Sequence, residues 1–275
     1  MSVMQEHGGP AATPATRASG HASGETSAAL SIRGVEVRYG ELLALQKVDL
    51  EVRQGEFVCL LGPSGCGKTT LLNVMSGFVR PTTGTAHTHG RAIQEPGPDR
   101  GMVFQEYGLF PWLTVKKNIQ YGPRLKGMPA EELERIADRY CAMVGLERFR
   151  DSYPGQLSGG MRQRAAIARA LANQPEILLM DEPFGALDAM TRQVLQEELL
   201  RIWEAQRKTL VFVTHSIAEA VFLADRIIVM SAHPGRIEHI VDNDIERPRD
   251  RTADAHFEMC RRIELLFQES GRHGG

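Results

Sequence analysis

The sequence contains little that suits a membrane-spanning or an exported protein. No apolar run approaches the roughly 18 residues that a membrane-spanning helix requires. The first residues also lack the charged segment followed by an apolar segment that marks a secretory signal. We therefore expect a chain that is not exported and that acts at a membrane only through a partner that spans it.

Cysteine and net charge are also scarce. The chain has four cysteines, and none forms a CxxC pair or a Cys/His spacing typical of a zinc site. This pattern favours a reducing cytoplasm. Cys66 could be redox-sensitive because it lies in the loop described below, although a small residue that merely fits there is the simpler interpretation. The net charge of −2 argues against a general nucleic-acid-binding protein, which usually has a basic face.

What the chain does contain is the composition of an ordinary globular protein, with 42% hydrophobic and 24% charged residues. The exception is residues 1–28, which are mostly Ala, Gly, Ser, Thr and Pro. Such a stretch cannot bury enough apolar surface to offset the entropy lost on ordering. We predict a disordered tail there and an ordered chain from about residue 29.

Strand-like and helix-like segments alternate along most of the ordered chain. The apolar run Phe57–Leu61 is typical of a central strand buried on both faces. Between about residues 105 and 170 the pattern is mainly helical. The alternation then resumes, which predicts an α/β fold with a largely parallel sheet and an inserted helical subdomain. The expected strands are 32–37, 48–52, 57–61, 177–180, 210–214 and 226–230, and the expected helices are 69–76, 131–144, 161–172, 191–206 and 217–224.

The most specific motif is the segment 62–69, which matches the P-loop pattern G-x-x-x-x-G-K-[ST] and follows a strand and precedes a helix. Glycines let backbone N–H groups turn toward a phosphate, and the helix N-terminus adds a positive potential. Lys68 is expected to reach the β- and γ-phosphates, and the Thr69 hydroxyl to bind Mg²⁺. We therefore predict a P-loop NTPase core whose loop binds nucleotide through Gly62, Pro63, Ser64, Gly65, Cys66, Gly67, Lys68, Thr69 and Thr70.

Two carboxylates follow the apolar strand 177–180. Asp181 and Glu182 therefore lie at the carboxyl edge of the expected sheet, where open α/β folds bind ligands. Asp181 is expected to hold Mg²⁺ through water, and Glu182 to accept a proton from the attacking water. Such a pair alone is often the solvated end of a strand, but its company with a P-loop favours a catalytic role.

The first two motifs predict only a P-loop NTPase, and a third motif, Leu157-Ser158-Gly159-Gly160-Met161, indicates which kind of P-loop NTPase this is. Ser158 with two glycines at a helix start is a second anion-binding site, although a serine there is often only an N-cap. Here the sequence resembles the ABC ATPase family, whose signature begins Leu-Ser-Gly-Gly. The resemblance implies that Ser158, Gly159 and Gly160 bind the nucleotide of a second subunit. Met161 departs from the pattern, since many family members have Gln there.

The resemblance, which covers about residues 30–235, implies four further site residues. Tyr39 would stack on the adenine ring, although an aromatic residue near a turn often only packs. Gln105 would contact Mg²⁺ and join the core to the helical subdomain. Asp188 lies in the loop that crosses the dimer interface, and His215 would touch the γ-phosphate. A lone histidine at a strand end is usually structural. The place of His215 in this series of motifs favours a functional role instead.

The resemblance also implies the molecular context. It predicts a small antiparallel β region beside the parallel sheet, an ABC ATPase domain over residues 29–240 and a C-terminal helical extension over 241–275. It implies ATP hydrolysis with ATP and Mg²⁺, a homodimer, integral-membrane permease subunits and, indirectly, a periplasmic or extracellular substrate-binding protein. The chain would be peripheral on the cytoplasmic face of the inner (cell) membrane, with no nucleic acid bound.

Finer likeness points to the nitrate/sulfonate/taurine-type importer branch, through the segments 102–105, 109–112, 181–188 and 231–237. The alternatives are an ABC exporter or lipid-handling ATPase and a non-transport ABC ATPase. The last is disfavoured because no long coiled-coil insertion separates the P-loop from the signature.

The segment 107–113 is a candidate docking surface. It is apolar and aromatic, as interface hot spots are, and it directly follows Gln105. We expect it to line a groove for a helix of the partner, the alternative being that it belongs to the core of the helical subdomain.

Overall fold

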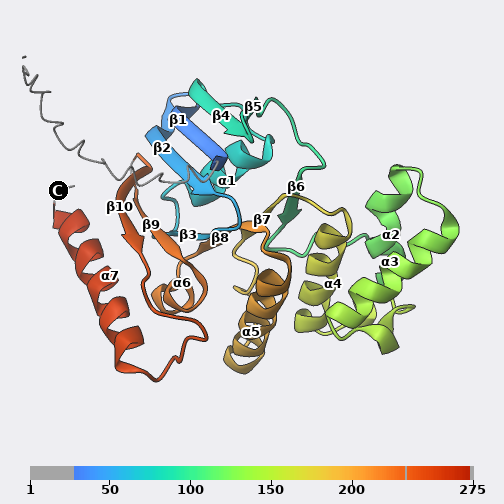
Figure 1. The fold of residues 1–275 in the computed structure, drawn as a ribbon. Coiled ribbons are helices and arrows are strands. Elements are labelled where there is room, and N and C mark those ends of the chain that lie inside the picture. The colour runs from blue at the N-terminus through green and yellow to red at the C-terminus, as the bar shows by residue number, and fades with distance from the viewer. Residues whose placement is uncertain (1–27, 233, 273–275) are drawn as a thin grey trace, which may run out of the picture.

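The computed structural model describes residues 28–232 and 234–272. The predicted tail lies outside these residues except for Ala28, which begins the first strand. His233, within the segment 231–237, also lies outside them. Figure 1 shows the N-terminal strands (blue to cyan) on one side of a larger sheet, orange and red helices on its other side, and the green helices at the far right of the molecule.

The larger sheet has six strands in the order β10-β9-β3-β8-β7-β6. All neighbours are parallel except β10, which is antiparallel to β9. Every residue of β3 and β8 is buried, as expected for central strands covered on both faces. The mainly parallel sheet is therefore confirmed. The strands are β3 (Phe57–Leu61), β6 (Arg100–Val103), β7 (Ile177–Asp181), β8 (Thr209–Thr214), β9 (Arg226–Ser231) and β10 (Arg236–Asp242).

The smaller sheet is the expected antiparallel region. It has the order β2-β1-β4-β5, formed by β1 (Ala28–Tyr39), β2 (Leu42–Arg53), β4 (Thr83–Thr88) and β5 (Arg91–Ala92). Helix α1 (Lys68–Ser76) packs its apolar side chains with those of β1, β2 and one face of β3 in a single apolar cluster. This cluster fixes the position of the loop that joins β3 to α1.

The opposite face of β3 belongs to a second apolar cluster. Because side chains alternate along a strand, Phe57, Cys59 and Leu61 enter this cluster, whereas Val58 and Leu60 enter the first. Helices α5 (Ala189–Gln206) and α6 (Ile217–Leu223) cover this face. The last helix, α7 (Asp254–Arg272), contributes the fully buried Ile263.

The insertion between β6 and β7 is mainly helical, as predicted. It comprises α2 (Val115–Leu125), α3 (Ala130–Met143), two 3₁₀ turns (Glu147–Phe149 and Pro154–Gln156) and α4 (Gly159–Ala172). Among residues 28–232 and 234–272, no helix has the length and apolar character needed to cross a membrane. The division of the chain at residues 28 and 240 stays a prediction.

Candidate functional site

The P-loop connects the carboxyl end of β3 to the start of α1. Gly65 and Gly67 have φ of +79° and +89°, a region that residues with a Cβ rarely adopt. A Cβ on Gly67 would also lie 2.5 Å from Leu45 Cδ2, and one on Gly62 would lie 2.6 Å from the carbonyl oxygen of Met230. The glycines therefore let the loop turn tightly against β2 and β9 while its backbone faces the adjoining cavity.

This cavity has a volume of about 690 Å³. The P-loop supplies one wall and the segments 39–44 and 234–235 supply another, with Glu182 at its edge. Its full lining is Tyr39, Leu42, Leu43, Ala44, Ser64, Gly65, Gly67, Lys68, Thr69, Thr70, Glu182, Pro234 and Gly235. Of the predicted P-loop residues, Gly62, Pro63 and Cys66 do not line this cavity.

Lys68 is nearly buried, with 5% of its surface exposed. Its ammonium donates to the carbonyl oxygens of Gly62 at 2.8 Å and Pro63 at 2.9 Å, so the cation is held in the wall of the cavity. Cys66 is fully buried, and burial raises the pKa of its thiol although the nearby Lys68 opposes this shift. A raised pKa disfavours the reactive thiolate, which favours the interpretation of Cys66 as a residue that fits its space.

Asp181 ends β7 beside the P-loop. Its Oδ1 accepts a hydrogen bond from the Thr69 hydroxyl at 3.1 Å. Burial raises the pKa of Asp181, and the hydrogen bond from Thr69 partly offsets that shift. A carboxylate and a hydroxyl side by side provide the oxygen ligands that Mg²⁺ prefers, and they leave most of its octahedral sites to phosphate and water. These residues therefore fit a magnesium ion bound together with a nucleotide.

Glu182 lies next to a histidine at the same edge. Its Oε2 is 3.1 Å from Nδ1 of His215, which follows β8. The backbone of Glu182 has φ of +41° and its N–H donates to the carbonyl oxygen of Val213, so β8 holds the residue in a left-handed conformation. Gln105 approaches the same place: a Cβ on Gly185 would lie 3.9 Å from Glu182 Oε2 and 4.0 Å from Gln105 Nε2. The carboxyl ends of β3, β6, β7 and β8 thus bring the predicted catalytic residues together.

Tyr39 is half exposed and lines the cavity on the side of the antiparallel sheet. The sequence analysis missed its neighbours in this wall, Leu42, Ala44 and the Pro234–Gly235 turn. Gly235 packs against two backbones at once, since a Cβ there would lie 2.4 Å from the carbonyl oxygen of Cys66 and 2.8 Å from that of Ala44. The Pro-Gly dipeptide was a turn signal, but nothing in it indicated contact with the P-loop.

The signature residues lie elsewhere. Ser158 is the N-cap of α4, where its hydroxyl accepts from the N–H of Met161 at 3.3 Å. Asp188 is the N-cap of α5, where it accepts from the N–H of Thr191 at 3.0 Å, and this bond lowers the pKa of its carboxyl. The two helix starts touch, because a Cβ on Gly160 would lie 2.7 Å from Thr191 Cγ2. Neither these residues nor Gly159 lines the P-loop cavity, and Figure 1 shows α1 and α4 apart.

The loop after Asp181 is fixed by Arg192 of α5, a residue that the sequence analysis did not single out. Its guanidinium donates to the carbonyl oxygens of Phe184 at 3.3 Å and Leu187 at 2.8 Å. The loop that ends at Asp188 is therefore held in one conformation by its own following helix.

Comparisons with known proteins agree with this geometry. The family model described as ABC transporter matches residues 45–185. An uncharacterized ABC transporter ATP-binding protein of Methanocaldococcus jannaschii is 56% identical over 82% of this chain and 85% of its own. A nitrate import ATP-binding protein of Synechococcus elongatus is 49% identical, covering 83% and 85%. A taurine import ATP-binding protein of Jannaschia sp. is 47% identical, covering 76% and 80%.

Among solved structures, a dimeric bacterial ABC transporter cassette superposes with a TM-score of 0.71 at 36% identity, covering 79% of this chain and all of the cassette. The matched family model spans the P-loop and the two carboxylates, which lie together at one edge of the sheet, and also the signature, which lies apart from them. The chain belongs to the ABC transporter family, as one of its ATP-hydrolysing cassettes.

Proposed function

We propose that the chain is the ATPase subunit of an ABC importer for a small anion, such as nitrate, sulfonate or taurine. The relatives named for nitrate import and taurine import align over most of both chains, which supports this branch. A periplasmic or extracellular binding protein would deliver the anion to the permease. The chain would remain peripheral on the cytoplasmic face of the inner (cell) membrane.

The geometry of the P-loop cavity supports separate roles for its residues in ATP hydrolysis. The P-loop backbone and Lys68 bind the phosphates, because they form one wall of the cavity. Thr69, Asp181 and Gln105 would hold Mg²⁺, which when bound neutralises charge on the phosphate oxygens.

Glu182 would accept the proton of the attacking water. His215 would touch the γ-phosphate and, through its 3.1 Å contact with Glu182, orient that carboxylate. Tyr39 offers a ring to the adenine from the opposite wall of the cavity.

The observation that carries the proposed homodimer is that the signature does not line the cavity of its own P-loop. The N–H groups at the start of α4 can bind an anion, but they do not line the cavity beside the P-loop of the same chain. We infer that Ser158, Gly159, Gly160 and Asp188 complete the nucleotide site of a second copy of this chain. Closure of two copies on two ATP molecules then builds complete sites, and hydrolysis lets them reopen.

The aromatic segment 107–113 is the proposed contact with the permease. Trp112 is 70% exposed, and the Phe110 ring contacts those of Trp112 and Tyr121 in tilted arrangements, with ring centroids 5.7 Å and 4.5 Å apart. The fully buried Asn118 shapes this segment, since its amide accepts from the N–H of Phe110 and donates to the carbonyl oxygens of Phe110, Leu113 and Thr114. Tyr107 and Leu109 of the segment pack against the apolar core, so the docking surface for a helix of a partner would be its exposed part around Trp112.

The homodimer can be tested with Ser158→Arg in a chain that also carries Glu182→Gln. Glu182→Gln alone should accumulate as a dimer with magnesium-ATP, because hydrolysis no longer reopens it. The double variant should stay monomeric while each monomer binds ATP with unchanged affinity. Sedimentation and equilibrium nucleotide binding measure the two properties. If Ser158→Arg weakens ATP binding by the monomer as strongly as Lys68→Ala does, the signature serves its own chain and the proposal fails.

The importer assignment requires the whole complex. The full chain should copurify with an integral-membrane permease, and vesicles holding the complex should take up a labelled small anion when ATP is present on the cassette side. Competition among nitrate, bicarbonate, sulfonates and taurine then identifies the cargo. ATP-driven movement in the opposite direction would favour the exporter alternative.

A further inference from the structure

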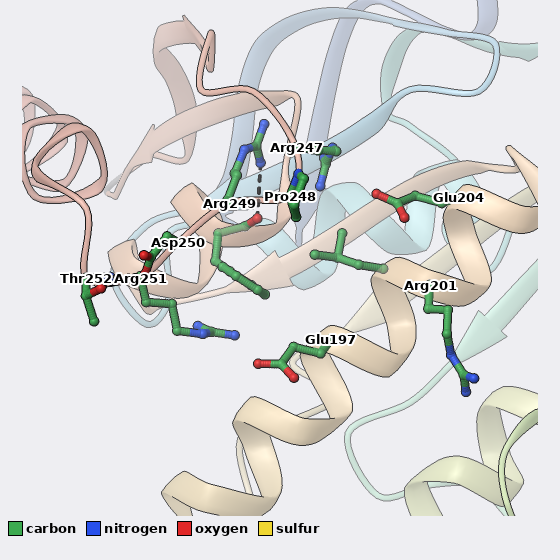
Figure 2. A pocket seen from close by; sticks show the side chains of 11 residues that line it. Glu197, Arg201, Glu204, Arg247, Pro248, Arg249, Asp250, Arg251 and Thr252 are labelled. Atoms are coloured by element: carbon green, nitrogen blue, oxygen red, sulfur yellow. Dashed lines mark hydrogen bonds between the residues drawn. The ribbon is translucent and has the colours of Figure 1, made fainter.

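A second cavity lies on the far side of the sheet from the antiparallel region, between α5 and the segment 243–253 that leads to α7. Its volume is about 560 Å³. Figure 2 shows Arg247, Arg249 and Arg251 along one side of it and Arg201 and Glu204 of α5 along the other. The proposed hydrolysis uses none of these residues.

The segment 243–253 is fastened to the carboxyl end of α6. Arg249 donates to the carbonyl oxygens of Val221, Phe222 and Ala224 at 2.8–3.2 Å, and Asn243 donates to those of Val221 and Ala224. Carbonyl groups at a helix end lack partners within the helix, so these bonds are the cap of α6. The position of the segment is thus coupled to that of α6.

Arg251 extends this connection inward. Its guanidinium lies 3.4 Å from the centre of the Phe222 ring and donates to Gln196 Oε1 at 2.7 Å. Gln196 in turn donates through Nε2 to Glu219 Oε1 at 2.6 Å. Gln196 and Glu219 are 2% and 7% exposed, so both partners of this bond are withdrawn from water.

The second oxygen of Glu219 accepts a hydrogen bond from the Thr214 hydroxyl. The same hydroxyl oxygen accepts from the N–H of Ser216 at 3.1 Å. Thr214 and Ser216 flank His215, whose ring meets Glu182. One continuous set of hydrogen bonds therefore runs from Arg251 through Gln196 and Glu219 to the turn that carries His215.

We propose that Arg251, Gln196 and Glu219 are positioning residues that hold the His215 turn for hydrolysis, so that the segment 243–253 helps to set the turnover rate. The proposal rests on the role of His215 proposed above. A buried carboxylate needs hydrogen-bond donors, and Glu219 has one in the amide nitrogen of Gln196. The bond that Arg251 donates to the amide oxygen of Gln196 favours the orientation in which the nitrogen faces Glu219.

The test compares Arg251→Met with Arg251→Lys and Arg201→Ala in the full-length chain. Methionine keeps an apolar stem on Phe222 but removes the donor, whereas lysine keeps a donor. Arg201 lines the same cavity, is 73% exposed at its side chain and pairs only loosely with Glu198 at 3.7 Å, which makes it a matched control. We expect Arg251→Met to lower kcat about tenfold, because a small misplacement of reacting groups has effects of this size or larger.

The expected profile distinguishes positioning from general destabilisation. For Arg251→Met, KM for ATP and the melting temperature should stay at wild-type values, Arg251→Lys should recover most of kcat, and Arg201→Ala should match wild type. In a His215→Ala background, Arg251→Met should have no further effect on kcat. Equal kcat for Arg251→Met and Arg201→Ala, or the same loss in both backgrounds, would overturn the inference alone. If His215→Ala leaves kcat unchanged, the proposed role of His215 fails, and this inference fails with it.

Discussion

Replacing Glu182 by Gln should slow ATP hydrolysis strongly while ATP stays bound. Glu182 lines the cavity with its Oε2 3.1 Å from His215 Nδ1, and its backbone is fixed by the bond from its N–H to Val213. Glutamine has nearly the same shape and can keep a hydrogen bond to His215. It cannot accept a proton from water, because a neutral amide is not a base at physiological pH.

The size of the effect follows from the part that Glu182 plays. A positioned general base contributes about 10²–10⁴-fold to a rate, and each factor of ten corresponds to about 1.36 kcal/mol of activation free energy. The barrier should therefore rise by about 3–5 kcal/mol. Binding of ATP should be no weaker than in the wild type, since the contacts of Lys68 and the P-loop backbone are untouched.

Single-turnover release of phosphate measures the chemical step, and equilibrium titration measures ATP binding. Glu176→Gln is the matched control, because Glu176 also pairs with a histidine, His89 at 2.7 Å, but lies outside the cavity. That control should hydrolyse ATP at the wild-type rate. A Glu182→Gln chain that releases phosphate as fast as this control would refute the assignment of Glu182 as the base.

Three further outcomes are expected. Trp112→Ala should reduce transport by the complex while leaving ATP binding unchanged. The control Phe257→Ala on α7 removes an aromatic side chain of similar exposure and should transport normally, so equal transport by both variants would mean that the docking surface lies elsewhere. Because burial raises the pKa of Asp181, its ionised form destabilises the fold above that pKa, and Asp181→Asn should therefore raise the melting temperature at pH 7. The gain should disappear as the pH falls to 3.8, the ordinary pKa of an aspartate, and a gain that does not change with pH would contradict this. Gly90→Ala should lower the unfolding free energy by about 1–2 kcal/mol because its backbone is left-handed, and Gly84→Ala should lower it clearly more because its Cβ would also meet the backbone oxygen of Gly34. Chemical denaturation measures both losses, and equal losses would be inconsistent with the steric argument.

The elements that could be predicted from the sequence are those with a continuous pattern of their own. Phe57–Leu61 is buried throughout and is apolar throughout, so pattern and structure coincide. The missed elements have a pattern that is short or interrupted. Strand β6 has four residues and includes Gly101, and α2 carries Gly122 and Pro123, which usually mark the end of a helix.

The candidate site divides in the same way. The P-loop, the signature and the carboxylates are each contiguous, and each has a local backbone reason for its residues. The remaining wall of the cavity depends on tertiary pairing, because the bridge between Leu45 and Gly235 brings the Pro234–Gly235 turn against the P-loop. No local property of that turn encodes its distant neighbour. The path from Arg251 to His215 was missed for the same reason.

Because Gly160 lies tightly against Thr191, a larger side chain at position 160 requires a smaller one at position 191. A methyl group at position 160 would occupy the volume of the Thr191 methyl, so Gly160→Ala should become tolerable once Thr191→Ser removes that methyl while keeping the N–H that Asp188 accepts. The starts of α4 and α5, which we propose to contact a second subunit, therefore fit against each other within one chain. A redesign of either one that treats it as an independent surface loop would displace the other.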